Sequence, residues 1–373
     1  MKFFKKIFSS NQRDFSDPEI LLEENSPLSP ITAVVEQDER VAYFYLWGPE
    51  GSRFGMKACW IRNLSQAPTK RDEAALKASM PPMLPAAHCK FPQGQEKLKK
   101  DKLRIVWLEE GDGAALYEGN KLLAAIPSWG GMGGFSGYAR DCIGQNELAW
   151  EFSVENVFPD RVKRAEEFWA SWDKENNPFA QYQSEFMQLY EEYFGESDTY
   201  FALDGEQGPP KGLYVRKGEQ KFVFASLGMA LFPMPQVEMY TERPGEIHRI
   251  ELACMLSKGI KEEDVQSMAN YFGGQTSLPW DQITFLGEGH TILFPLGEDS
   301  GFSAVLLTNT LSVLPKVELP DYRSSKVNLL WMIPITEAER KYALEKGSES
   351  LKKKLDKLGD EVFSLERKST IKP

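Results

Sequence analysis

The chain contains three histidines, His88, His248 and His290, the side chains best suited to proton transfer near neutral pH. Only His290 has a context that suggests catalysis, because it follows the turn Gly287-Glu-Gly289 and lies close to Trp280-Asp281. A His–Asp pair there could act as a general base, but no Gly-x-Ser-x-Gly nucleophile elbow accompanies it. Two interpretations stay open: a hydrogen-bonded structural histidine, or the base of a hydrolase with an aromatic-lined cleft.

A glycine-rich segment, Gly130-Gly-Met-Gly-Gly-Phe-Ser-Gly137, could in principle cradle a phosphate. A dinucleotide fingerprint must run directly from a strand into a helix, so that backbone N–H groups and the helix dipole meet the pyrophosphate. Here Pro127-Ser-Trp129 intervenes and no strong helix follows. We expect a glycine-rich turn that is either purely structural or presents Trp129 and Phe135 to a partner, and no nucleotide cofactor.

The four cysteines, Cys59, Cys89, Cys142 and Cys254, lie far apart in the sequence and form no C-x-x-C pair. This spacing is typical neither of a disulfide framework nor of a zinc site, and the three histidines are equally dispersed. The sequence therefore predicts reduced, mostly buried thiols and no metal.

The charge of the chain limits its partners. At 373 residues, with a formal net charge of −11, the chain is long enough for two globular domains and is acidic. Nucleic-acid binding draws most of its affinity from Lys and Arg, so a basic or apolar protein partner is expected instead. No stretch reaches the ~20 apolar residues of a membrane span, and the basic, aromatic segment Met1–Phe8 is not an export signal. This segment is either a frayed end or a weak contact with an anionic membrane, and a cytoplasmic location is expected.

The N-terminal half is predicted to contain a flexible arm over residues 1–37 and a β-rich domain over residues 38–152. Residues 153–195 then predict two amphipathic helices. Asn177-Pro178 is an expected N-cap and first helical residue, and Gly195 is an expected C-cap.

The C-terminal half reads as an α+β domain over residues 196–359 with a tail over residues 360–373. The apolar segments Ala304–Thr308 and Val327–Ile333 predict strands covered on both faces. Six further strands are predicted near residues 199–203, 212–215, 221–227, 248–256, 283–285 and 290–294. One helix is predicted over residues 261–272 and another from Thr336, with a break at Gly347. A seam of apolar side chains is predicted at Leu351, Leu355, Leu358, Val362 and Leu365. The seam is expected to pack on its own domain.

An ordered set of motifs runs through this second half: Ser226-Leu-Gly228, Glu251-Leu252, Gly289-His290, Leu306-Leu-Thr-Asn309, Pro334-Ile-Thr-Glu-Ala-Glu339 and Gly347-Ser-Glu-Ser-Leu351. Together they resemble the suppressor of fused family, in particular its bacterial branch, over residues 198–355. The resemblance implies an α+β protein of two β-rich domains, the C-terminal one suppressor of fused-like.

The resemblance also implies a binding role without catalysis. The animal member clamps an extended peptide of Hedgehog-pathway transcription factors between two lobes, and the corresponding segment here runs from Phe222 to Tyr240. Phe232-Pro-Met-Pro-Gln236 replaces the polar turn expected there, so the resemblance does not imply recognition of the same peptide. For bacterial relatives the resemblance implies immunity proteins that neutralise toxins by stoichiometric binding. A basic toxin domain is the partner that this role suggests, and the alternative is the hydrolase that uses His290. The partner-binding residues expected are Phe224, Gly228, Met229, Glu238, Tyr240, Trp129, Phe135, Trp280 and His290.

Overall fold

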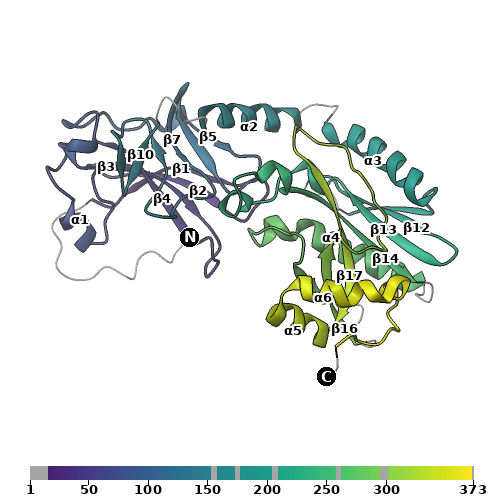
Figure 1. Cartoon of the computed structure of the whole chain (residues 1–373). Helices are drawn as coiled ribbons and strands as arrows, with labels where there is room; N and C mark the ends of the chain where they lie inside the picture. The colour runs from purple at the N-terminus through teal and green to yellow at the C-terminus, as the bar shows by residue number, and fades with distance from the viewer. Residues whose placement is uncertain are drawn as a thin grey trace. The chain divides into compact units, whose positions relative to one another are not determined.

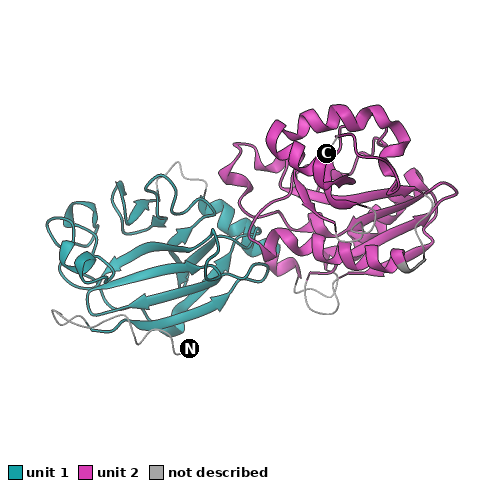
Figure 2. Ribbon diagram, turned by 90° about the horizontal axis from the view of Figure 1, so that it is seen from below, with its two compact units in different colours: residues 1–168 teal, residues 169–373 magenta. Residues whose placement is uncertain are grey.

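The computed structural model describes residues 16–152, 158–172, 177–203, 209–257, 262–294 and 301–371. Figure 1 shows the chain, and Figure 2 colours its two compact units, residues 1–168 and 169–373. The segment Met1–Phe8 lies outside the described residues. Within those residues, no helix is both long and apolar enough to cross a membrane.

Unit 1 is built from two sheets. The first is antiparallel, with the order β1-β2-β3-β4: β1 Glu19–Asn25, β2 Thr32–Gln37, β3 Val41–Trp47 and β4 Met56–Asn63. The second has the order β5-β6-β7-β8-β10-β9: β5 Leu103–Trp107, β6 Ala114–Glu118, β7 Lys121–Ile126, β8 Tyr138–Ala139, β9 Gln145–Asn146 and β10 Ala149–Glu151. The short helix α1, Glu73–Lys77, lies in the connection between the sheets.

The flexible arm predicted for residues 1–37 is wrong for its second half. Strands β1 and β2 form a hairpin that extends the first sheet, and the side chains of Leu21, Ile31 and Val35 are buried. The acidic residues that suggested a tether lie mainly on exposed positions of β1, where they do not interfere with pairing.

The two predicted helices are present, as α2, Phe158–Trp172, and α3, Pro178–Phe194. Asn177 caps α3 by accepting from the N–H of Phe179 at 3.0 Å, and Gly195 ends the helix at φ +97°, as predicted. The two helices do not form one linker between the units, because the boundary between unit 1 and unit 2 falls inside α2, after Phe168. The first turns of α2 pack on the second sheet of unit 1.

Unit 2 contains one seven-stranded sheet with the order β11-β12-β13-β14-β17-β16-β15. Its strands are β11 Thr199–Ala202, β12 Gly212–Lys217, β13 Lys221–Leu227, β14 Arg249–Ser257, β15 Thr291–Leu293, β16 Phe302–Thr308 and β17 Val327–Thr336. All pairs are antiparallel except β14 with β17. The predicted fold class is confirmed, and β16 and β17 lie inside the sheet as expected.

Two predicted elements differ. Helix α4 spans Glu262–Asp281 and continues past Phe272. The strand predicted at residues 283–285 is absent, because the chain turns there with Ile283 at φ +47°. A C-terminal pair, α5 Glu337–Lys346 and α6 Ser348–Leu355, is separated at Gly347 as predicted, and Leu351, Leu355 and Val362 are buried in the described part of unit 2.

The register of the sheet places α3 and α4 on opposite faces. Tyr214 lies opposite Ala225, and its ring contacts Tyr190 of α3. The next residue, Val215, lies opposite Phe224, whose ring contacts Phe272 of α4. Because successive strand residues face opposite sides, the sheet is sandwiched between the two helices.

A buried carboxylate connects α3 to this sheet. Glu251 of β14 is fully buried and accepts four hydrogen bonds, from the Tyr182 hydroxyl at 2.7 Å, the Ser226 hydroxyl at 2.5 Å, and the N–H groups of Gly228 at 2.9 Å and Ala230 at 3.1 Å. Burial raises the pKa of Glu251, and the hydrogen bonds offset this only in part. Ser226 and Gly228 belong to one sequence motif and Glu251 to another, and the structure joins the two motifs by hydrogen bonds.

A buried ion pair fixes the C-terminal residues. Arg367 donates to both carboxylate oxygens of Glu339 at 2.8 and 2.9 Å, and both side chains are almost inaccessible. Glu339 also closes a capping box with Thr336 at the start of α5 and accepts from Thr370. Residues 360–371, predicted as a tail, are therefore docked on unit 2.

We expect Glu251→Ala to destabilise the protein by about 3 kcal/mol or more, since it leaves buried donors unpaired, whereas Glu251→Gln should cost about 1 kcal/mol. Because the pKa of Glu251 is higher in the folded chain, Glu251 loses its proton at a lower pH in the unfolded chain than in the folded chain. The stability that Glu251 contributes is therefore present below its unfolded pKa and is lost as pH rises through the folded pKa. Urea unfolding of wild type and Glu251→Gln across this window would test both points. A pH-independent difference between the two proteins would contradict the assignment.

We expect Glu339→Gln to cost about 3–5 kcal/mol, because it leaves the Arg367 guanidinium buried without its counter-charge. Burial alone would raise the pKa of Glu339, but the hydrogen bonds and charge of Arg367, with the N–H groups of Thr370 and Thr336, outweigh it and hold this pKa below its ordinary value. This stability is present above the unfolded pKa and is lost as pH falls through the folded pKa.

The exposed pair Arg243–Glu246 supplies the control for this measurement, since its side chains are 78% and 62% exposed. Glu246→Gln should change the free energy of unfolding by less than about 0.5 kcal/mol. Equal effects of Glu339→Gln and Glu246→Gln in urea unfolding would disprove the role of the buried pair.

Candidate partner-binding site

Several residues predicted to bind a partner lie in the core of unit 2. The side chains of Phe224, Met229 and Trp280 are at most 3% exposed. The Trp280 indole donates to the Pro233 carbonyl at 3.2 Å and packs edge-on against Phe232. These side chains build the domain, and a partner that leaves the core intact does not reach them.

Gly228 serves the turn that follows β13. It adopts φ +96°, and a Cβ atom there would lie 2.7 Å from the Pro210 carbonyl oxygen and 2.9 Å from the Phe179 ring. Only glycine combines this backbone conformation with such a close approach. The requirement is structural, because the turn is the one held by Glu251.

Tyr240 and His290 come together through a residue that the sequence did not indicate. The Phe285 ring lies 5.1 Å from the Tyr240 ring and 5.2 Å from the His290 ring, and Tyr240 is 67% exposed. Glu238, two residues before Tyr240, is partly exposed. We call Tyr240, Phe285 and His290 the aromatic surface; it lies beside β15, an edge strand on which Leu293 is 72% exposed.

The surroundings of His290 do not resemble a catalytic base. Burial lowers its pKa, which a hydrogen bond with the Phe285 backbone opposes in part. Within the described residues, Phe285 supplies the ring contact, and no hydrogen bond links the imidazole to Asp281. Trp280 points into the core instead of lining a cleft with His290. No observation on the described residues favours the hydrolase.

Trp129 and Phe135, at the glycine-rich turn of unit 1, pack inward. Phe135 is 5% exposed and contacts the rings of Tyr138 and Trp150 at 4.8 and 4.9 Å. The Trp129 ring packs edge-on against Phe158 at the start of α2. The turn leads into β8 and not into a helix, which excludes the dinucleotide geometry and leaves the structural interpretation.

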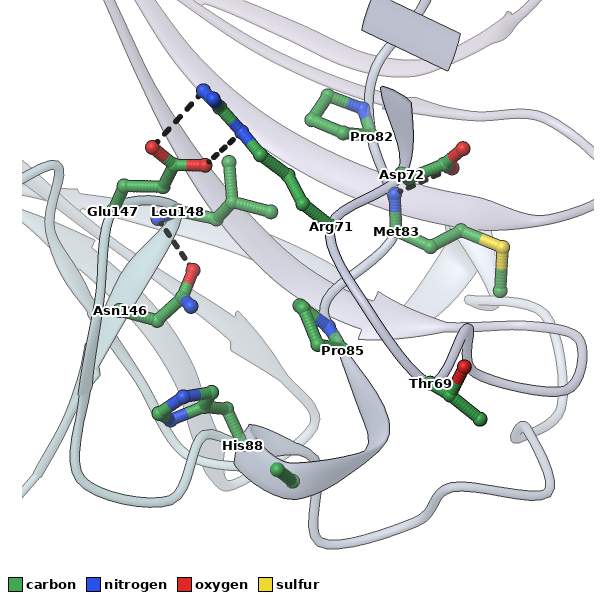
Figure 3. A pocket seen from close by; sticks show the side chains of 11 residues that line it. Thr69, Arg71, Asp72, Pro82, Met83, Pro85, His88, Asn146, Glu147 and Leu148 are labelled. Atoms are coloured by element: carbon green, nitrogen blue, oxygen red, sulfur yellow. Dashed lines mark hydrogen bonds and ion pairs between the residues drawn. The ribbon is translucent and has the colours of Figure 1, made fainter. Parts of the chain in front are cut away.

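Unit 1 has a cavity of about 290 Å³ between the α1 region and the segment 146–148 (Figure 3). Arg71 on its wall forms a two-pronged ion pair with Glu147, at 2.7 and 3.1 Å, and Asp72 accepts from the N–H groups of Ala75 and Met83. His88 lies 3.1 Å from the Ile143 carbonyl oxygen through Nδ1. The charged groups of this cavity already have partners, so it offers no ready recognition site for an ionic ligand.

A groove in unit 2 lies beside a free strand edge. Edge strand β11 pairs with β12 alone among the described strands, and a groove of about 320 Å³ separates it from α4. We call it the β11–α4 groove; its lining is Phe201, Ala202, Leu203, Gln266, Ala269, Asn270, Gly273 and Gly274. A Cβ atom on Gly274 would find open space within 4 Å, and one on Gly273 would only touch the Leu203 carbonyl at 3.8 Å.

The register of β11 turns alternate backbone units outward, including that of Ala202. The N–H of Leu203 donates to the Lys211 carbonyl at 2.9 Å, and Ala202 lies opposite Gly212. Hydrogen-bonded and non-hydrogen-bonded pairs alternate in an antiparallel ladder, so the N–H and C=O of Ala202 point away from β12. By contrast β13, which carries the predicted segment from Phe222, is hydrogen-bonded on both sides and has no free edge.

The sequence analysis missed both Phe285 and this groove. Phe285 was assigned to a strand, whereas it belongs to the turn after α4. The adjacent glycines Gly273 and Gly274 directly follow the predicted helix and lie inside α4. They were the available signal, because glycine in a helix interior costs about 1 kcal/mol relative to alanine and suggests a packing or functional reason.

Comparisons with known proteins agree with the resemblance. A family model described as suppressor of fused protein (SUFU) matches residues 209–368. A suppressor of fused homologue from Neisseria gonorrhoeae is 18% identical with a TM-score of 0.39, over 52% of this chain and 99% of its own. A structure of the Sufu–Fu complex is 14% identical with a TM-score of 0.38, over 52% of this chain and 91% of the other.

Drosophila Suppressor of Fused gives 14% identity and a TM-score of 0.37, over 52% of this chain and 51% of its own. No curated protein matched. The family match begins just before β12 and ends within the docked C-terminal residues, so it covers β12–β17 with α4, α5 and α6. Residues 209–368 of this chain are therefore similar to the suppressor of fused family.

Proposed function

We propose that this chain is a non-catalytic, cytoplasmic protein-binding module that captures an extended segment of its partner in the β11–α4 groove. The observation that carries the proposal is an edge strand with an outward-facing backbone unit at Ala202, bordered by an open groove. Backbone hydrogen bonds to such an edge supply affinity, and the groove beside it supplies selectivity.

The lining of the groove indicates the kind of segment that fits. Gln266 donates to Asn270 at 3.2 Å on the exposed face of α4, so amides and bare backbone at Gly273 and Gly274 face the captured chain. Among the described residues, no Lys, Arg, Asp or Glu lines the groove. An extended segment with polar or small side chains at alternate positions matches this lining.

The charge of the whole chain supports a basic partner. A net charge of −11 raises the association rate with a basic protein through long-range attraction. The role we propose is that of an immunity-type protein, which neutralises a basic toxin domain by stoichiometric binding. The aromatic surface, which includes the predicted residues Tyr240 and His290, provides a second contact at the opposite edge of the sheet.

Two substitutions test the groove without disturbing the fold. Gly274→Leu fills the open space and should raise helix stability by roughly 0.5–1 kcal/mol, while it blocks the captured segment. Ala202→Pro removes an N–H that β12 does not use, which an edge strand tolerates. Ala202→Thr keeps this N–H and is the matched control.

We expect wild type and Ala202→Thr, used as baits at low and moderate salt, to retain the same stoichiometric, salt-sensitive partner from the native lysate. Gly274→Leu and Ala202→Pro should bind this partner at least about tenfold more weakly, which corresponds to about 1.4 kcal/mol of binding free energy. Tyr240→Ala reports separately on the aromatic surface. Equal recovery with all groove variants, at unchanged melting temperature, would reject the groove. A captured toxin whose activity is not reduced at one-to-one stoichiometry would reject the immunity role.

A further inference from the structure

Two cysteines that are distant in sequence lie directly opposite each other in unit 1. Cys89 and Cys142 form an isolated antiparallel bridge between the segment after Pro85 and the segment after β8. The N–H of Lys90 donates to the Asp141 carbonyl at 2.9 Å, and the N–H of Ile143 donates to the His88 carbonyl at 2.7 Å. These bonds flank the two cysteines and do not join them, so the pair is of the non-hydrogen-bonded type.

This pairing type is the one in which side chains approach most closely. In a non-hydrogen-bonded antiparallel pair the Cα atoms are about 4.5 Å apart and both side chains lie on the same face. A disulfide needs Cα atoms about 4.4–6.8 Å apart. The backbone at Cys89 and Cys142 therefore has the spacing that a disulfide requires.

The two segments are also held in register by side chains. Lys90 forms an ion pair with Glu151 at 2.8 Å and donates to the Arg140 carbonyl at 2.9 Å, and Gln95 donates to Asp141 at 3.0 Å. The register of the two segments that carry the thiols is thus fixed before any bond between them forms.

We propose that Cys89 and Cys142 are an intramolecular disulfide site, oxidised by low-molecular-weight disulfides of the glutathione class. The thiolate of Cys89 attacks one sulfur of the small disulfide, and the released thiolate takes up a proton. The thiolate of Cys142 then attacks the Cys89 sulfur of the mixed disulfide and displaces the second small thiol. Two protein thiols and one small disulfide become one protein disulfide and two small thiols.

The hydrogen bonds at each sulfur set this order. The Cys142 thiol donates to the Ala149 carbonyl at 3.2 Å, which favours its protonated form, and burial raises the pKa of Cys142 to about 12. Cys89 receives instead a hydrogen bond from the Phe91 backbone, which opposes the rise in its pKa that burial causes. The amide of Asn63 also points toward its sulfur at 3.9 Å. Cys89 is therefore the attacking thiol and Cys142 the resolving one.

Access to the buried thiols requires a local opening. Both side chains are at most 2% exposed, but the bridge is isolated from the regular ladders on either side. Ala87 and His88, which precede Cys89, line the cavity of unit 1 (Figure 3). Segments of this kind open more readily than the sheet core.

The test is thiol mapping of the folded, full-length chain after incubation with oxidised glutathione, followed by acid quench, alkylation and mass spectrometry of unreduced peptides. We expect one linked peptide pair, Cys89 with Cys142, while Cys59 and Cys254 are alkylated. The same chain oxidised in urea is the control, since it has lost the register and should distribute its bonds over all pairs of the four cysteines. Four alkylated thiols in the folded chain would overturn the proposal, as would a dominant bond between Cys59 and Cys142.

Two variants test the order of attack. Cys142→Ser should accumulate a glutathione adduct on Cys89, whereas Cys89→Ser should leave Cys142 unmodified. An adduct on Cys142 with none on Cys89 would reverse the assignment. The melting temperature of the wild-type chain tests the disulfide itself, whether or not the variants fold. Oxidation should raise it by several degrees, and an unchanged or lower value would contradict a disulfide that fits the native register.

Discussion

Unit 2 depends on one buried turn whose peptide groups are hydrogen-bonded by two side chains of the same strand. The turn Gly228–Leu231 follows β13 and is buried, so its peptide groups cannot be left to water. Glu251 accepts from the N–H groups of Gly228 and Ala230, and Arg249, two residues earlier on the same face of β14, donates to the carbonyls of Ala230 and Leu231. The same carboxylate binds Tyr182, so that α3, β13 and β14 cannot be displaced from one another independently.

This arrangement explains what the family motifs do in this chain. Ser226, Gly228 and Glu251 meet at the buried carboxylate. Thr336 and Glu339 form the capping box that holds Arg367. Glu288, next to the Gly289-His290 motif, accepts from Thr308, from the N–H of Asn309 and from Lys352 of α6. The motifs therefore identify polar contacts that define the fold, and they need not identify the surface that binds a partner.

The sequence predicted elements well where local signals and burial agree. Asn177, Pro178 and Gly195 bracket α3 because capping depends on neighbouring residues alone, and the apolar runs of β16 and β17 can only be covered on both faces. It failed where distant residues decide the outcome. Acidic β1 is a strand because β2 pairs with it, and the C-terminal residues are docked because Glu339 needs the Arg367 guanidinium.

The same distinction applies to the candidate site. Phe224, Met229 and Tyr240 were predicted because the resemblance implies a peptide-contacting segment there, and Trp280 and His290 because of their residue types and spacing. The contact of Tyr240 and His290 with Phe285 depends on a turn with Ile283 at a positive φ that no periodicity indicates. Phe224, Met229 and Trp280 are core residues, since aromatic and apolar side chains look alike in sequence whether they face a partner or the interior. Which strand lies at a free edge depends on the order of the strands in the sheet, and the pattern of a single sequence does not specify that order.

The shortness of β11 limits how readily two copies of this chain could pair through this strand edge. A long exposed edge is a template on which any extended chain, including another copy, can polymerise. With only four residues, β11 offers few outward-facing backbone groups with which to hold an arbitrary strand. A segment that binds there must gain the rest of its free energy from side-chain contacts, so a short edge favours selective binding over pairing with any extended chain.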